Sequence, residues 1–307
     1  MLLRMVIAVC LSISVAAAIQ SQPQKREIIS HDFTNNRQNA APEEPVVKGS
    51  QRQSRNRTRY TSKPPRPYRL ASSAMANVTD SDPASIKQLG LTIWRLRPVS
   101  VNDQGPKLSV IVNGASSERV PERTEADTKF QKGDHVRLSI ESPHPGYLYV
   151  VNREMFADGT TGSATLIYPW AGMFRGENRV QAGRVIDIPA QDDNPSYFTA
   201  NPTRPDQIAE LLTFIVTKTP LNLPLSNETV QISDAQMAQW EKRWRAQNER
   251  FELEGGAGET WTKQEQQAAL RVRPRRLTRD DPAPQTIYRV TASNRLAFLV
   301  NVRLSYR

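Results

Sequence analysis

The sequence has a single cysteine, Cys10, and only three histidines, His31, His135 and His144, among 307 residues. Cys10 lies in an apolar run near the N-terminus, and a chain cleaved after that run keeps no disulfide, thiol nucleophile or thiolate metal site. The chain also lacks a CxxC pair, an HExxH motif and histidines paired at metal-ligand spacing. We therefore expect no metal and no cofactor, and we place each histidine at the surface or in a turn.

Motifs of the common hydrolases and nucleotide-binding proteins are missing as well. The chain contains no GxSxG elbow and no GxxxxGK[ST] or GxGxxG loop. Its nearest string, residues 159–163, has the wrong spacing and indicates a hairpin loop. Asp158 and residues 192–194 could offer oxygen ligands to calcium, but they match no EF-hand spacing and are typical of turns. The sequence favours a non-enzymatic protein, and the alternative is a secreted hydrolase whose active-site residues are dispersed along the chain.

A run of apolar residues long enough for a membrane helix, about 20 residues, is also missing. The apolar run at residues 5–15 is shorter, follows Arg4 and precedes three alanines at residues 16–18. This order is typical of a secretory signal cleaved after Ala18. We therefore expect a signal peptide at residues 1–18 and an exported, periplasmic or secreted protein without a transmembrane span in its mature chain. The alternative is an uncleaved anchor.

Positive charge is concentrated in one part of the chain. The formal net charge is +10, of which residues 21–87 carry +6 and residues 88–307 only +3. Residues 19–87 are rich in polar residues and proline and show no apolar period, which predicts a disordered basic tether. Its basic cluster consists of Arg52, Arg55, Arg57, Arg59, Lys63, Arg66 and Arg69.

This basic arm has two interpretations. It could bind polyanions, and anionic envelope polymers or phospholipid head groups are the targets we expect, because nucleic acid is not an expected partner of an exported protein. The other interpretation is a solvated tether between the export site and the folded domain.

The sequence pattern of residues 88–307 differs from that of residues 19–87 and predicts one β-sandwich domain. Short segments alternate apolar and polar residues, and turn signals such as Asn113-Gly114 separate them. Many short strands without regular helices between them favour a mainly β fold, an antiparallel, immunoglobulin-like β-sandwich. Residues 146–152 are apolar on both faces, which predicts a central strand. The other predicted strands are residues 91–96, 108–112, 136–140, 164–168, 184–188, 212–218, 286–290 and 296–304, the last two joined as a hairpin by residues 291–295.

A short helical insertion is predicted at residues 233–270, near the C-terminus. A capping box at residues 233–236 opens its first helix, and Thr262 with Glu265 opens a second helix that ends at about Leu270. One face of the first helix carries aromatic residues that could dock a partner, although at helical spacing such a stripe is more often core. The stripe consists of Met237, Trp240, Trp244 and Phe251.

Aromatic residues also gather between residues 147 and 174. On one exposed face they would form a binding platform for a sugar or a peptide, and if buried they belong to the core, which their places on or beside predicted strands favour. The candidate platform consists of Tyr147, Tyr149, Tyr168, Trp170 and Phe174, and Phe156 lies among them.

An ordered series of short motifs runs through about 130–225. These motifs are Phe130–Ile140, Pro145–Val151, Asp158-Gly159, Leu166–Pro169, Asn178–Val180, Ala182-Gly183, Ile186–Pro189, Phe214–Thr217 and Pro220-Leu221. The series resembles the bacterial family called domain of unknown function 4384. The resemblance implies an all-β module of uncharacterised activity, often found on exported or multidomain proteins, and it assigns no catalytic residue. Together these features predict an exported, non-enzymatic β-sandwich module that binds a protein or another component of the envelope.

Overall fold

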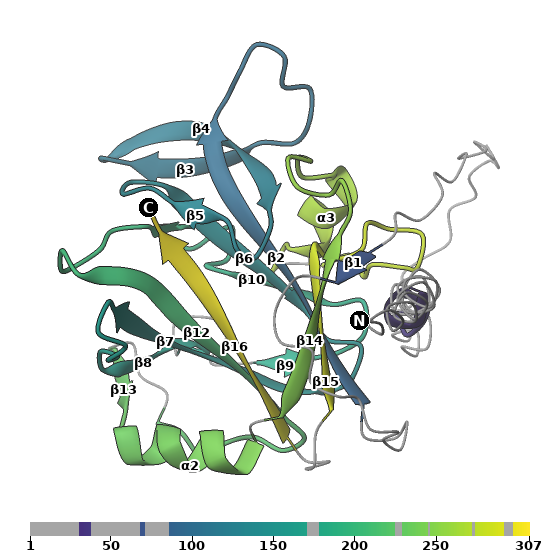
Figure 1. The fold of residues 1–307 in the computed structure, drawn as a ribbon. Coiled ribbons are helices and arrows are strands. Elements are labelled where there is room, and N and C mark those ends of the chain that lie inside the picture. The colour runs from purple at the N-terminus through teal and green to yellow at the C-terminus, as the bar shows by residue number, and fades with distance from the viewer. Residues whose placement is uncertain are drawn as a thin grey trace, which may run out of the picture.

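The computed structural model describes residues 31–37, 68–70, 86–170, 178–224, 229–244, 246–271, 274–291 and 297–307. The described chain is mainly β, and two sheets pack face to face around a shared core (Figure 1). Among the described residues, strand pairs are antiparallel except for one short parallel pair. The predicted antiparallel β-sandwich is therefore confirmed, while the predicted signal at residues 1–18 lies outside the described residues.

The first sheet is organised around one long strand, β2 (Ile86–Pro98). One edge of β2 pairs with β15 (Thr286–Thr291) and then with β4 (Ala115–Thr124), and the other edge pairs with β6 (His135–Glu141). This sheet also contains β1 (Tyr68–Leu70), β3 (Leu108–Val112), β10 (Val185–Ile188), β11 (Phe198–Thr199) and β14 (Gln247–Leu253).

The second sheet is organised around β12 (Gln207–Thr217), which lies between β7 (Gly146–Phe156) and β16 (Ala297–Tyr306). Both neighbours pair with β12 along almost its whole length, so β12 is a central strand. This sheet also contains β5 (Lys129–Phe130), β8 (Ala164–Tyr168), β9 (Arg179–Val180) and β13 (Val230–Ile232).

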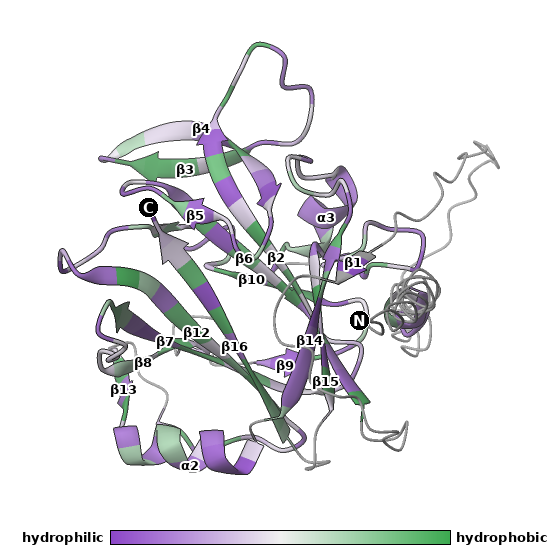
Figure 2. Ribbon diagram, in the orientation of Figure 1, coloured by the Kyte–Doolittle hydropathy of each residue, from purple (hydrophilic) through white to green (hydrophobic). Residues whose placement is uncertain are grey.

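Alternation along the strands divides the buried residues into an inner core and outer clusters. On β7, Leu148 and Val150 face the inner core, while Tyr149 and Val151 face the other side of the sheet, where helix α2 (Asp234–Trp244) covers them. The prediction of a central strand apolar on both faces is thereby confirmed. Figure 2 shows the same alternation of apolar and polar bands along β16.

The helical insertion is confirmed in its two helices and differs between them. Ser233 accepts a hydrogen bond from the backbone N–H of Gln236 at 3.2 Å, and Met237, Trp240 and Trp244 are buried against the second sheet, so this aromatic face is core. Helix α3 (Lys263–Ala268) has the predicted capping box. Phe251, however, lies on β14 between the helices, because that strand completes the first sheet beside β15. The residues predicted to form one aromatic stripe therefore belong to two elements, α2 and β14.

The predicted C-terminal hairpin is wrong. β15 pairs with β14 and β2 in the first sheet, whereas β16 pairs with β12 and β5 in the second sheet. Two alternating segments joined by a short link satisfy the same pattern whether they pair together or cross from one sheet to the other. Here the crossing gives each strand a partner that is distant in sequence.

Two stretches of the predicted tether are ordered parts of the domain. Residues 31–35 form a helical turn with Phe33 fully buried, and β1 pairs with β14 at the edge of the first sheet. Residues 38–67 and 71–85 lie outside the described residues.

Candidate functional site

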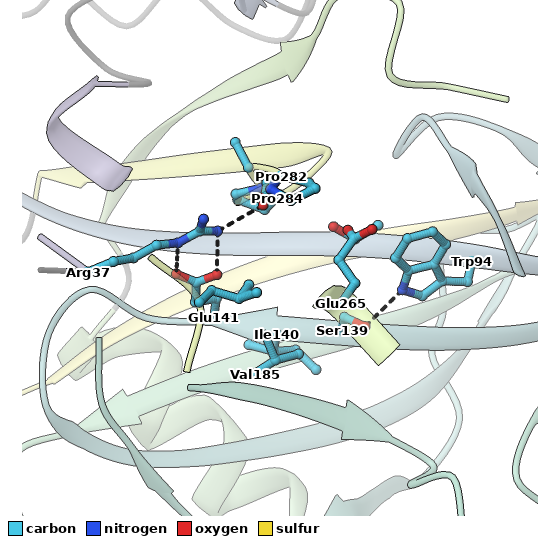
Figure 3. A pocket seen from close by; sticks show the side chains of 12 residues that line it. Arg37, Trp94, Ser139, Ile140, Glu141, Val185, Glu265, Pro282 and Pro284 are labelled. Atoms are coloured by element: carbon cyan, nitrogen blue, oxygen red, sulfur yellow. Dashed lines mark hydrogen bonds and ion pairs between the residues drawn. The ribbon is translucent and has the colours of Figure 1, made fainter. Parts of the chain in front are cut away.

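A groove lies on the outer face of the first sheet, and we call it the outer-face groove. β2, β6 and β10 form its floor, and α3 with residues 277–284 and Arg37 form its walls (Figure 3). Within it, Arg37 donates to both carboxylate oxygens of Glu141, from Nε to Oε1 at 2.6 Å and from Nη2 to Oε2 at 2.7 Å. The pair is buried, and such a two-point contact fixes the guanidinium in position and in plane.

The other N–H groups of Arg37 bind the backbone across the groove. Nη1 donates to the carbonyl oxygens of Thr278 at 3.1 Å and Asp281 at 3.2 Å, and Nη2 donates to that of Pro282 at 3.1 Å. All five N–H groups of a guanidinium are thereby used. Arg37 therefore joins residues 31–37, β6 and the segment before β15 in one contact.

The ring of Phe33 lies near the lining residue Pro284, and we include its place in the outer-face groove. Its ring is fully buried in a cluster with Phe251, Leu253 and Ile287 on the outer face of β14 and β15. A Cβ at Gly90 would lie 2.7 Å from Cζ of Phe33 and 2.7 Å from Cγ of Pro284. Glycine at this position of β2 therefore leaves the space in which the Phe33 ring packs.

A second buried ion pair lies beside the floor of the groove, next to Ser139. Arg137 on β6 donates from Nη2 to Oδ2 of Asp187 on β10 at 2.5 Å, and both side chains are almost completely buried. Burial raises the pKa of Asp187, against the opposing charge of Arg137. Ser139 donates to the other oxygen of Asp187 at 2.5 Å and accepts from the indole N–H of Trp94 at 2.8 Å. The guanidinium lies over the ring of Trp261, 5.4 Å from its centroid.

Helix α3, which lies in the C-terminal part of the sequence, contributes a further ion pair to this network. Glu265 on α3 is ion-paired with Arg123 on β4, and both are buried. Arg123 also lies 5.2 Å from the ring centroid of Trp94. A helix face without charge would leave the buried guanidinium of Arg123 without a carboxylate partner. Glu265 supplies that partner, so α3 is suited to cover these strands.

The groove does not have the dimensions of a substrate pocket. Its remaining space has room for about one or two water molecules. Two carboxylates, those of Glu141 and Glu265, line it together with the hydroxyl of Ser139, but each of these groups is already held by an arginine or an aspartate partner. The geometry of this groove therefore does not support the alternative of a hydrolase whose active-site residues are dispersed along the chain.

The two described histidines of the β-sandwich lie apart from these groups. His135, at the start of β6, stacks on Tyr197 with ring centroids 4.0 Å apart. His144 lies in the turn before β7, where Ser142 donates to its backbone oxygen at 2.8 Å. Burial lowers the pKa of both imidazoles. The contacts of both histidines are those of structural residues in the fold.

The candidate aromatic platform is divided between the two faces of the second sheet. Tyr168 is buried in the inner core, whereas Tyr149 is buried beneath α2 with Tyr147 packed against the same cluster. Trp170 is 39% exposed, and Phe174 lies outside the described residues. The described members therefore share no single exposed face.

Of the basic cluster, the structure describes only Arg69. It is exposed on β1 and ion-paired with Glu125. The cluster members outside the described residues are Arg52, Arg55, Arg57, Arg59, Lys63 and Arg66.

A different exposed feature lies at the end of the first sheet formed by residues 99–112, which we call the apolar end. Val101 is 94% exposed, Ile111 43% and Val99 36%, and they are three of the five exposed large apolar side chains among the described residues. The loop after β2 and the hairpin of β3 and β4 project here from the body of the sandwich (Figure 1).

Sequence reasoning missed the outer-face groove because its charged residues stand at strand positions that alternation assigns to solvent. Arg137 and Asp187 are polar residues inside predicted strands, and nothing in the pattern shows that α3 and residues 277–284 cover them. Phe33 and Arg37 stand in a polar stretch without a period. The available signal was Phe33 itself, an isolated aromatic residue one helical turn before an arginine.

Neither a membrane-spanning helix nor a metal cluster is found in the described part of the chain. Its helices fall short of the length and apolar character that a bilayer crossing requires. Its histidine, cysteine, aspartate and glutamate side chains form no group of three or more suited to a metal ion.

One family model matches the middle of the chain. Residues 129–219 match the model of the family described as domain of unknown function (DUF4384), which confirms the predicted resemblance. No curated protein and no solved structure matches the chain. The matched residues contribute β5 to β12, whereas β2, β15 and β16 come from outside them. Because β6 pairs with β2 and β12 pairs with β16, the sandwich is larger than the family match.

Proposed function

We propose that the chain is an exported, non-enzymatic β-sandwich module that binds another protein of the cell envelope through the apolar end. The secretory pattern of residues 1–18 supports export. The exposure of Val101, Ile111 and Val99 within residues 99–112 is the observation that carries the binding role, because exposed large apolar side chains favour protein contacts.

The apolar end is held firmly by the domain behind it. Leu108 and Val110 on the inward face of β3 are buried with Trp94 and Trp261, and the hydroxyl of Tyr197 donates to the backbone oxygen of Ile111 at 2.9 Å. A surface presented in one conformation loses less entropy on binding than a free loop does. This support favours the hairpin as a preformed contact surface.

A photo-crosslinking amino acid placed at position 101 of the full chain tests this proposal. We expect one main adduct with an envelope protein, and we expect excess wild-type chain, but not excess Val101→Ser/Ile111→Ser chain, to suppress it. The same crosslinker at Gln239, exposed on α2, is the matched control. Equal adducts from both positions, or none from position 101, would contradict the proposal. Fractionation with N-terminal sequencing tests export separately.

A further inference from the structure

Residues 31–37 contact the domain as a bound peptide does. The segment contributes no strand to either sheet. Two backbone hydrogen bonds lie within the segment, from Asn36 N–H to the oxygen of Asp32 at 3.3 Å and from Arg37 N–H to that of Thr34 at 3.1 Å. Phe33, within the helical residues 31–35, and Arg37, two residues after them, are the buried side chains of this segment.

The groove has a separate, complementary set of contacts for each of these two side chains. An apolar cluster with Gly90 as its floor receives the ring of Phe33, and the carboxylate of Glu141 with three carbonyl oxygens receives the guanidinium of Arg37. An aromatic anchor and a fully paired arginine are the side chains that most often dominate protein interfaces. The groove therefore has the two features of a specific docking site.

The link between this segment and the next described residue is long. Residues 38–67 separate Arg37 from Tyr68, and 30 residues can span up to about 100 Å when extended. Such a link lets the segment reach the groove of its own chain, where a high effective concentration favours it, and it also lets the segment reach a second copy.

We propose that the outer-face groove is a docking site for the Phe33–Arg37 segment and that it accepts this segment from a second copy of the chain when its own segment does not occupy it. This interaction uses a surface separate from the apolar end and goes beyond the proposed function. The recognised chemistry is a helical turn with an aromatic residue four positions before an arginine. In the wild-type chain the segment of the same molecule fills the groove.

Two full-chain variants with complementary defects test the proposal. Phe33→Ala/Arg37→Ala removes the anchors and leaves a competent groove. Gly90→Leu/Glu141→Gln keeps the segment and alters both parts of the groove, since a leucine side chain at position 90 points into the space of the Phe33 ring. We expect the mixture to form a one-to-one complex in analytical ultracentrifugation, at least about tenfold tighter than self-association of either variant. Absence of a complex between two folded variants overturns the proposal.

A labelled peptide of residues 28–40 provides a second measurement that needs only one variant. We expect it to bind the Phe33→Ala/Arg37→Ala chain and to bind the wild-type chain at least about tenfold more weakly, because the wild-type groove is occupied. The same peptide with Phe33→Ala and Arg37→Ala is the control and should bind neither. Equal binding to both chains, or binding to neither, overturns the proposal. Loss of cooperative unfolding in the Phe33→Ala/Arg37→Ala chain also overturns it, because the segment would then be an integral part of the core.

Discussion

Replacing Arg137 by alanine is expected to destabilise the protein by about 3–5 kcal/mol, because the substitution leaves the carboxylate of Asp187 buried without its charge partner. Both side chains are at most 2% exposed, so bulk water does not solvate the carboxylate of Asp187 in the folded chain. Ser139 would keep its hydrogen bond to Asp187 but cannot neutralise it. Urea unfolding followed by circular dichroism measures the change.

Two substitutions control this experiment. Arg204 forms an ion pair with Asp206 at 2.6 Å, close to the 2.5 Å of the buried pair, but these side chains are 55% and 41% exposed. Arg204→Ala should therefore cost less than about 1 kcal/mol. The double variant Arg137→Met/Asp187→Leu should recover most of the loss, because no unpaired charge remains. A change below about 1 kcal/mol for Arg137→Ala would contradict the burial described for this pair.

The stability of the protein is expected to depend on the protonation of Glu252, on β14. Its side chain is 1% exposed, and burial raises its pKa from 4.5 to about 7, against hydrogen bonds from Thr286 at 3.0 Å and from the backbone N–H of Ala126 at 3.3 Å. The folded chain thus keeps this proton up to about pH 7, whereas the unfolded chain releases it near pH 4.5. The stability from this group is complete below pH 4.5 and is lost as the pH rises to 7.

Glu252→Gln removes this dependence because an amide does not titrate. We expect the free energy of unfolding of the variant, minus that of the wild type, to rise by about 3 kcal/mol between pH 4.5 and pH 8. Urea titrations at several pH values measure the difference. Glu118→Gln, on the exposed face of the β3–β4 hairpin, controls for the loss of one negative charge. A constant difference across this pH range would show that Glu252 ionises in the folded chain as it does in the unfolded chain.

The strands of the inner core could be predicted because their residues alternate strictly or are apolar on both faces. β7 is the clearest case, since Leu148 and Val150 face inward while Tyr149 and Val151 meet α2. β4 was not predicted, because its residues are mostly polar and become buried only where Val120 and its neighbours meet other elements. Alternation therefore reports the faces of a strand and does not report which elements cover them.

Pairing and docking over long sequence separations could not be predicted from local pattern. Phe251 follows a helical spacing after Trp244, yet it lies on β14 because the edge of β15 is available there. The contact of Arg37 with Glu141 spans 104 residues, and no local signal links the two. Local sequence pattern therefore does not predict the outer-face groove, because it does not show which charged residues meet there.

Segments on both sides of the family match are integral to one β-sandwich. Expression of residues 129–219 alone, followed by urea unfolding, tests it most directly. In that fragment β6 lacks β2 and β12 lacks β16, so both inner faces lose much of their core. We predict no cooperative unfolding transition for the fragment and a cooperative one for the full chain. A cooperative transition in the fragment would show that the family-matched residues fold alone and would contradict this account.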